Sequence, residues 1–85
     1  MRYVVYRQDS YPPFRETVLR ILDTKKEALV YLANSLYDSV YYKPPTRKTT
    51  TELEQMSEEA LYNLCDVLSD HLGEGGSPPN MKVIN

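Results

Sequence analysis

The chain has 85 residues, of which 41% are hydrophobic and 26% are charged, and its net charge at pH 7 is −2. These values are typical of one folded domain and exclude a largely disordered chain. Cys65 is the single cysteine, which excludes an internal disulfide and favours a reducing, cytoplasmic setting. The apolar runs are too short for a signal peptide or a membrane-spanning helix, so we expect no membrane partner.

Charge is unevenly distributed along the chain, and tyrosine is unusually frequent. Residues 1–48 carry nine Lys and Arg against five Asp and Glu, whereas residues 49–85 carry one Lys against seven acidic residues. The two halves could attract each other or present a basic and an acidic face to different partners. There are eight tyrosines, a residue typical of boundaries and interfaces where one edge of the ring stays in water.

The first 22 residues predict an antiparallel β-hairpin. Residues 2–8 (RYVVYRQ) are rich in β-branched and aromatic side chains, and neither face of this strand is strictly polar, which is typical of a central strand or one covered on both sides. Residues 15–22 (RETVLRIL) alternate apolar and charged side chains, as a second strand does. The stretch DSYPPF at 9–14 joins them as a loop, because a Pro-Pro pair cannot continue a strand ladder.

Residues 24–42 predict the first helix. Thr24 and Glu27 match a capping box, in which the hydroxyl accepts from one backbone N–H and the carboxylate from another. The helix ends at Lys43, because a residue before proline avoids helical backbone. The apolar side chains at helical spacing, which should pack on the hairpin, are Ala28, Leu29, Leu32, Leu36 and Val40.

The rest of the chain predicts a second helix between two irregular segments. Thr51 or Ser57 would begin this helix, and Gly73 would end it. The predicted segments are a connector at 43–51, a helix at 52–72, a loop of flexible composition at 73–80, and a stretch of β character at 81–85 that could be a third strand or a loose tail. The chain is therefore predicted to be one α+β domain, 1–85, with the order ββαα(β) and two helices on one face of a small antiparallel sheet.

No group of residues matches an enzyme or a metal site. Cys65 and His71 are six residues apart, so they fall on different sides of a helix and suit no catalytic dyad. One His and one Cys are also too few for a typical zinc site. The glycines at 73–76 follow a helix instead of leading into one, and the neighbours Glu58 and Glu59 point in different directions. We therefore expect a non-enzymatic protein with no cofactor and no metal.

A protein-binding surface fits the remaining features best. Tyrosine beside arginine is the composition of binding hot spots. The segment YYKPPTRK at 41–48 would be structural if its tyrosines pack under the second helix, and a binding site if they face solvent. The predicted surface comprises Tyr37, Tyr41, Tyr42, Arg47 and Lys48, with Tyr11 and Phe14 of the hairpin loop as a second patch.

Two other classes of function remain open, a nucleic-acid-binding protein that uses the same tyrosines and cations, and a homo-oligomer in which tyrosines pair across a two-fold axis. The net charge of −2 and the acidic second helix disfavour a nucleic-acid partner. The acidic side chains could instead mimic phosphates, but full mimics carry far more negative charge. The side chains concerned are Glu54, Glu58, Glu59, Asp66, Asp70 and Glu74.

In size, composition and lack of catalytic groups, the chain resembles the small single-domain proteins of bacteriophages and mobile genetic elements. Such proteins often bind a host protein stoichiometrically and block it. The resemblance therefore implies an inhibitor of a host protein.

Overall fold

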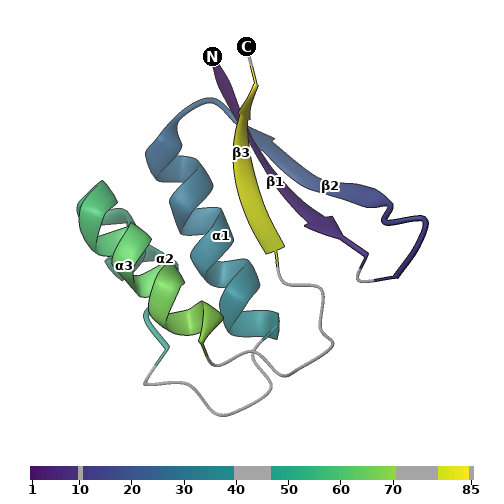
Figure 1. The fold of residues 1–85 in the computed structure, drawn as a ribbon. Helices are drawn as coiled ribbons and strands as arrows, with labels where there is room; N and C mark the ends of the chain where they lie inside the picture. Colours follow the sequence, from purple (N-terminus) through teal and green to yellow (C-terminus); the bar gives the residue numbers. More distant parts are fainter. Residues whose placement is uncertain (10, 40–46, 71–78, 85) are drawn as a thin grey trace.

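The computed structural model describes residues 1–9, 11–39, 47–70 and 79–84, which form three strands and three helices (Figure 1). In chain order these are β1 (Arg2–Gln8), β2 (Glu16–Leu22), α1 (Lys25–Ser39), α2 (Thr50–Glu54), α3 (Glu58–Ser69) and β3 (Pro79–Ile84). The α+β class is confirmed. The stretch of β character near the C-terminus is a third strand, which begins at Pro79, inside the segment predicted as a loop.

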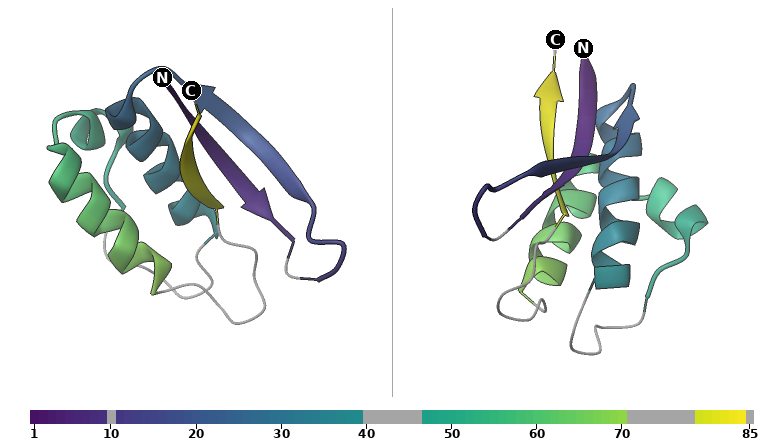
Figure 2. Two further views of the ribbon diagram at one scale, coloured as in Figure 1. Left: turned by 45° about the horizontal axis from the view of Figure 1, so that its top comes forward. Right: turned by 90° about the vertical axis from the view of Figure 1, so that its right-hand side faces the viewer.

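β1 is the central strand of the antiparallel sheet, whose order is β2-β1-β3. Tyr3 pairs with Leu22 on one side and with Val83 on the other, so the first and last strands are neighbours and both termini lie at one end of the sheet (Figure 1). The register with β2 shifts between Val5 and Tyr6, as at a β-bulge. Because a bulge increases local twist, it bends the far part of the hairpin, and the hairpin loop projects away from the helices (Figure 2).

The helices lie on one face of the sheet and form the hydrophobic core with it, as predicted (Figures 1 and 2). α1 packs against all three strands, and α3 packs along α1. On both helices the buried residues recur at helical spacing and so form one apolar stripe. The buried core residues are Val5, Leu22, Ala28, Leu29, Val30, Leu32, Ala33, Leu36, Tyr37, Leu53, Leu61, Cys65 and Leu68.

The single second helix predicted over 52–72 is wrong, because the chain forms the short α2 and then α3. Two caps explain the break. The Thr49 hydroxyl accepts from the Glu52 N–H at 3.2 Å, and the Glu52 carboxylate accepts from the Thr49 N–H at 3.1 Å. The pKa of Glu52 lies below its ordinary value because the Thr49 backbone N–H, and after it the Thr49 hydroxyl, donate to this carboxylate. Ser57 then caps α3 by accepting from the Ala60 N–H at 3.1 Å. The extended backbone that this cap requires stops α2.

The first predicted helix agrees with α1 at its start. The Thr24 hydroxyl accepts from the Glu27 N–H at 3.1 Å, as in the predicted capping box. α1 is described to Ser39, so the predicted end of that helix at 42 lies outside the described residues. The same holds for residues 71 and 72 at the predicted end of the second helix.

Replacing Ser57 with alanine tests the second cap. We expect the free energy of unfolding to fall by about 1 kcal/mol, because the Ala60 N–H at the start of α3 loses its acceptor. Ser57→Asp keeps an acceptor and serves as the control, with a loss of less than about half that amount. Urea denaturation followed by circular dichroism measures both. Equal midpoints for Ser57→Ala and the wild type would show that the cap does not stabilise α3.

Candidate protein-binding surface

The first predicted patch is partly a packing feature. Tyr37 is only 8% exposed and belongs to the core cluster. Its hydroxyl accepts from the Lys48 backbone N–H at 3.3 Å, and the Arg47 guanidinium lies 5.2 Å from the centre of its ring. Arg47 also pairs with Asp38 at 2.9 Å. The structure therefore brings Tyr37, Arg47 and Lys48 together as predicted, but they hold the segment before α2 against α1, and Tyr37 offers little ring surface to a partner.

The remaining two members of that patch, Tyr41 and Tyr42, lie outside the described residues. Arg47 and Lys48 are exposed, so a partner could reach their cationic groups. The side chain of Arg47 is nevertheless committed to Asp38 and to the Tyr37 ring, which leaves the first patch without a free aromatic anchor among its described members.

The second predicted patch, Tyr11 and Phe14, is exposed to solvent, in contrast to the buried Tyr37 of the first patch. Tyr11 is 74% exposed and Phe14 is 52% exposed. They stand at the two ends of a turn that contains the cis Pro12-Pro13 bond, and the turn is closed by the Phe14 N–H, which donates to the Tyr11 carbonyl at 2.9 Å. Below it, the Asp9 N–H donates to the Arg15 carbonyl at 2.9 Å. The loop thus displays two aromatic side chains on a backbone fixed by hydrogen bonds.

Phe14 also has a backbone conformation that its side chain disfavours. Its φ angle is 55°, in the left-handed region that glycine tolerates and aromatic residues rarely enter. Such a conformation costs about 1–3 kcal/mol, and strained residues of this kind concentrate at functional sites. Because the ring is half exposed and lies outside the core cluster, burial in the fold does not offset this cost. This combination makes the loop, residues 11–14, the strongest candidate for a binding site.

The sheet face opposite the helices, which was not predicted as a site, mixes apolar and polar side chains. We call it the open sheet face. Its apolar members are Val4, Tyr6, Val18, Ile21 and Ile84, and its polar members are Arg2, Gln8, Glu16, Asn80 and Lys82, of which Lys82 pairs with Glu16 beside the Tyr6 ring. The sequence indicated this surface through the first strand, in which neither face is strictly polar. That pattern does not show whether another part of the same chain covers the second face.

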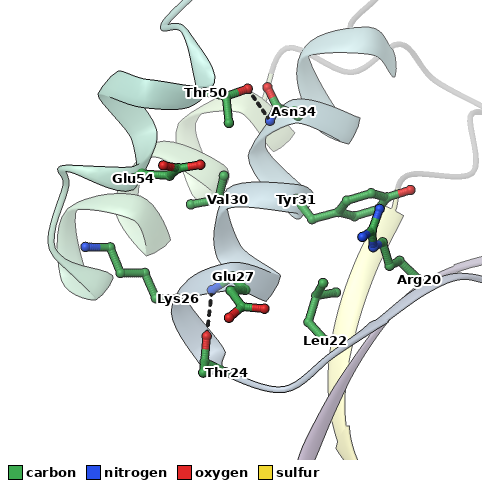
Figure 3. A pocket seen from close by; sticks show the side chains of 10 residues that line it. All are labelled: Arg20, Leu22, Thr24, Lys26, Glu27, Val30, Tyr31, Asn34, Thr50 and Glu54. Atoms are coloured by element: carbon green, nitrogen blue, oxygen red, sulfur yellow. Dashed lines mark hydrogen bonds between the residues drawn. The ribbon is translucent and has the colours of Figure 1, made fainter.

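A groove of about 550 Å³ lies between β2, α1 and α2 (Figure 3). Arg20 lies 5.7 Å from the centre of the Tyr31 ring, and the Asn34 amide donates to the Thr50 hydroxyl at 3.3 Å. The charged groups stand around its rim and do not converge on one point (Figure 3). The lining residues therefore bring together no nucleophile and base. They are Arg20, Leu22, Thr24, Lys26, Glu27, Val30, Tyr31, Asn34, Thr50 and Glu54.

Cys65 is a core residue. It is buried between α1 and α3, its thiol lies 3.9 Å from the Leu29 carbonyl oxygen, and burial raises its pKa to about 11. The thiolate, which is the reactive form, is therefore disfavoured at neutral pH. His71 lies outside the described residues. In the ranges that the structure describes, no three His, Cys, Asp or Glu side chains gather as a metal site would require.

None of the described helices is long and apolar enough to cross a membrane. No protein-family model, curated protein or solved structure matches the chain. Its function is therefore inferred from its own residues, and the exposed, strained hairpin loop is the feature that the fold itself explains least.

Proposed function

We propose that the protein is a non-enzymatic protein-binding module whose hairpin loop, residues 11–14, inserts its two aromatic side chains into a cleft of a partner protein. The observation that carries the proposal is Phe14, an exposed aromatic residue held at a φ angle of 55°. Exposed apolar surface and strained backbone both cost free energy in the isolated protein, and a partner that buries the rings offsets that cost.

The loop is also suited to binding because two backbone hydrogen bonds hold it, one between Tyr11 and Phe14 and one between Asp9 and Arg15. Binding a preformed loop loses less conformational entropy than ordering a free one, so more of the contact free energy appears as affinity. Tyrosine and other large aromatic residues supply most of the binding energy at many interfaces.

The position of the loop favours insertion into a concave site. It lies at the end of the sheet away from the two termini and projects clear of the helices (Figure 2). A narrow projection with an aromatic residue at each end of its turn can enter a cleft that the wider body of the domain cannot. Occupying the cleft would block it, so we propose stoichiometric inhibition as the mode of action, in keeping with the resemblance to small phage proteins.

The double variant Tyr11→Ala/Phe14→Gly tests the proposal. We expect the affinity for the partner to fall at least about tenfold, since hot-spot residues contribute about 2 kcal/mol or more. Stability should not fall, because both side chains are exposed and glycine adopts the left-handed conformation of residue 14 without the strain that Phe14 bears. The partner is captured from lysate of the source cells on the immobilised wild-type protein, identified, purified and titrated by calorimetry.

Tyr62→Ala is the matched control, because Tyr62 is an equally large exposed ring on α3, far from the loop. It should bind the partner as the wild type does. A partner that binds the loop variant with unchanged affinity, or that is lost only from Tyr62→Ala, would refute the proposed role of the loop. Capture of nucleic acid in place of a protein would refute the class of function.

A further inference from the structure

β3 is an edge strand, and no strand pairs with its outer side among residues 1–9, 11–39, 47–70 and 79–84. The Met81 N–H donates to the side-chain oxygen of Asn80 at 2.8 Å, so this N–H faces away from β1. Alternate residues of an antiparallel strand present their backbone groups in the same direction, and the Val83 N–H therefore faces outward as well. An edge of this kind can pair with a further extended strand.

A groove of about 370 Å³, which we call the β3 groove, lies beside this edge between β3, α1 and α3. α3 lies on the β3 side of α1, and α2 lies on the other side (Figure 2). The groove is lined by Leu32 and Leu36 of α1, by Asp66 of α3 and by Met81 of β3. A strand added outside β3 would lie about 4.8 Å from it and would extend the sheet along this groove.

The backbone groups of the edge select the shape of the occupant. A helix uses its N–H and C=O groups within itself, whereas an extended segment can pair them with the outward groups of Met81 and Val83. Every second side chain of such a segment would face the β3 groove. In this mode of recognition main-chain hydrogen bonds supply affinity, and pockets for alternate side chains supply specificity.

The charge of α3 selects the side chains of the occupant. α3 carries Glu58, Glu59 and Asp66 and has no Lys or Arg, and Asp66 lines the groove. Lys82 of β3 does not neutralise this charge, because it pairs with Glu16 on the open sheet face. A second copy that paired through its own β3 would bring a second acidic α3 to the same place, whereas a basic segment would be attracted.

We propose that the edge of β3 and the β3 groove bind an extended segment of a protein other than the loop's partner. The segment carries an aliphatic residue and, two residues away on the same face, a Lys or Arg. The aliphatic side chain would enter the groove against Leu32 and Leu36, and the cation would lie beside Asp66. A carbonyl of the segment would replace the Asn80 side chain as the acceptor of the Met81 N–H.

The site is independent of the hairpin loop. The groove lies on the helical side of the sheet, whereas the loop projects away from the helices (Figure 2). Each site therefore takes a ligand of its own, and the inference does not rest on the proposed function of the loop.

The probe is a displayed library of unstructured peptides of about ten residues, selected for binding to the wild-type protein. Val83→Pro should weaken the selected peptides about tenfold, because proline removes the outward N–H and an edge strand tolerates proline where its N–H faces solvent. Val83→Ala is the matched control, since it trims the same side chain but keeps the N–H, and it should bind the peptides as the wild type does. Asn80→Ala should bind them at least as tightly, because it removes the competing acceptor of the Met81 N–H.

Asp66→Lys tests the charge preference, and it carries the test alone if thermal melting shows that Val83→Pro does not fold. Asp66 is exposed, so the fold should tolerate the change. We expect the basic peptides to bind about tenfold more weakly and to lose the salt dependence that they show with the wild type. The loop variant Tyr11→Ala/Phe14→Gly should bind the peptides unchanged, which separates this site from the loop.

Three outcomes would overturn the inference. The first is that no peptide is selected, and the second is that the selected peptides bind Val83→Pro and Asp66→Lys as tightly as the wild type. The third is a wild-type dimer in sedimentation that Val83→Pro abolishes, which would make a second copy the occupant. Failure of the loop variant to lose its partner would leave this site standing, because the peptides are measured in the absence of that partner.

Discussion

Replacing Leu61 with alanine should lower the free energy of unfolding by about 2–5 kcal/mol, the usual cost of a cavity left by a buried leucine. Leu61 is fully buried on α3 and belongs to the cluster that joins α3 to α1. A domain of this size has only about 4–13 kcal/mol of stability, so the variant should be partly unfolded at 37 °C. Urea denaturation followed by circular dichroism gives the difference.

The neighbouring residue is the control for that substitution. Tyr62 is exposed on the same helix, and Tyr62→Ala should change the free energy of unfolding by no more than about 0.5 kcal/mol. If Leu61→Ala and Tyr62→Ala gave the same midpoint, α3 would contribute little to the core, and the packing of α3 on α1 described above would be wrong.

The second large effect is a loss of stability at alkaline pH that depends on Cys65. Burial raises the pKa of its thiol from 9.0 to about 11, so the folded protein favours the neutral form more than the unfolded chain does. The resulting stabilisation is fully present below pH 9 and is lost as the pH rises to about 11. Because a tenfold change in the ionisation constant equals about 1.4 kcal/mol, the loss is about 3 kcal/mol.

Comparison with Cys65→Ala isolates this effect from the titration of tyrosines and lysines, which both proteins share. The wild type should be the more stable protein at pH 8, because the thiol fills space between α1 and α3. Its advantage should shrink by about 2 kcal/mol by pH 11, where about half of the thiol in the folded protein is still protonated. Urea midpoints measured at both pH values test this, and parallel pH profiles for the two proteins would contradict it. Native alkylation of the thiol should be correspondingly slow at pH 8.

Local sequence signals predicted the elements that local interactions determine. The Thr24 cap and the apolar spacing behind it predicted α1, because both depend on residues within a few turns of one another. The Pro-Pro pair predicted the hairpin loop for the same reason. The predicted start at Ser57 is confirmed as the cap of α3, whereas Thr51 is wrong because Thr49 caps α2. The break between the two helices was missed because Thr51 and Ser57 were treated as alternative starts of one helix, and a sequence pattern does not show that two caps are used.

Long-range contacts explain the rest of the difference. The pairing of β3 with β1 joins the two ends of the chain, and no local pattern reports such a contact. Packing between distant segments also determines which tyrosines are buried and which are exposed. The sequence pattern placed Tyr37 on a solvent-facing side of α1, but Arg47 and Lys48 pack over it and leave it buried. The exposure of Tyr11 and Phe14 was predictable, since a turn built on two prolines has no core to face.

The open sheet face shows a different limit. An apolar pattern on both sides of a strand predicts that both faces are covered, but it does not say which molecule provides the cover. In this chain the helices take one face, and the part of the chain that the structure describes places no helix on the other (Figure 2).

The most direct test of the account is photo-crosslinking from the hairpin loop in the source cells. p-Benzoylphenylalanine is placed at residue 14, where it retains an aromatic ring, and at residue 62 on α3 as the control. We predict one dominant protein adduct from residue 14, absent from residue 62 and competed by untagged wild-type protein. No protein adduct from residue 14, or the same adducts from both positions, would contradict the claim that this loop is the surface through which the protein binds its partner.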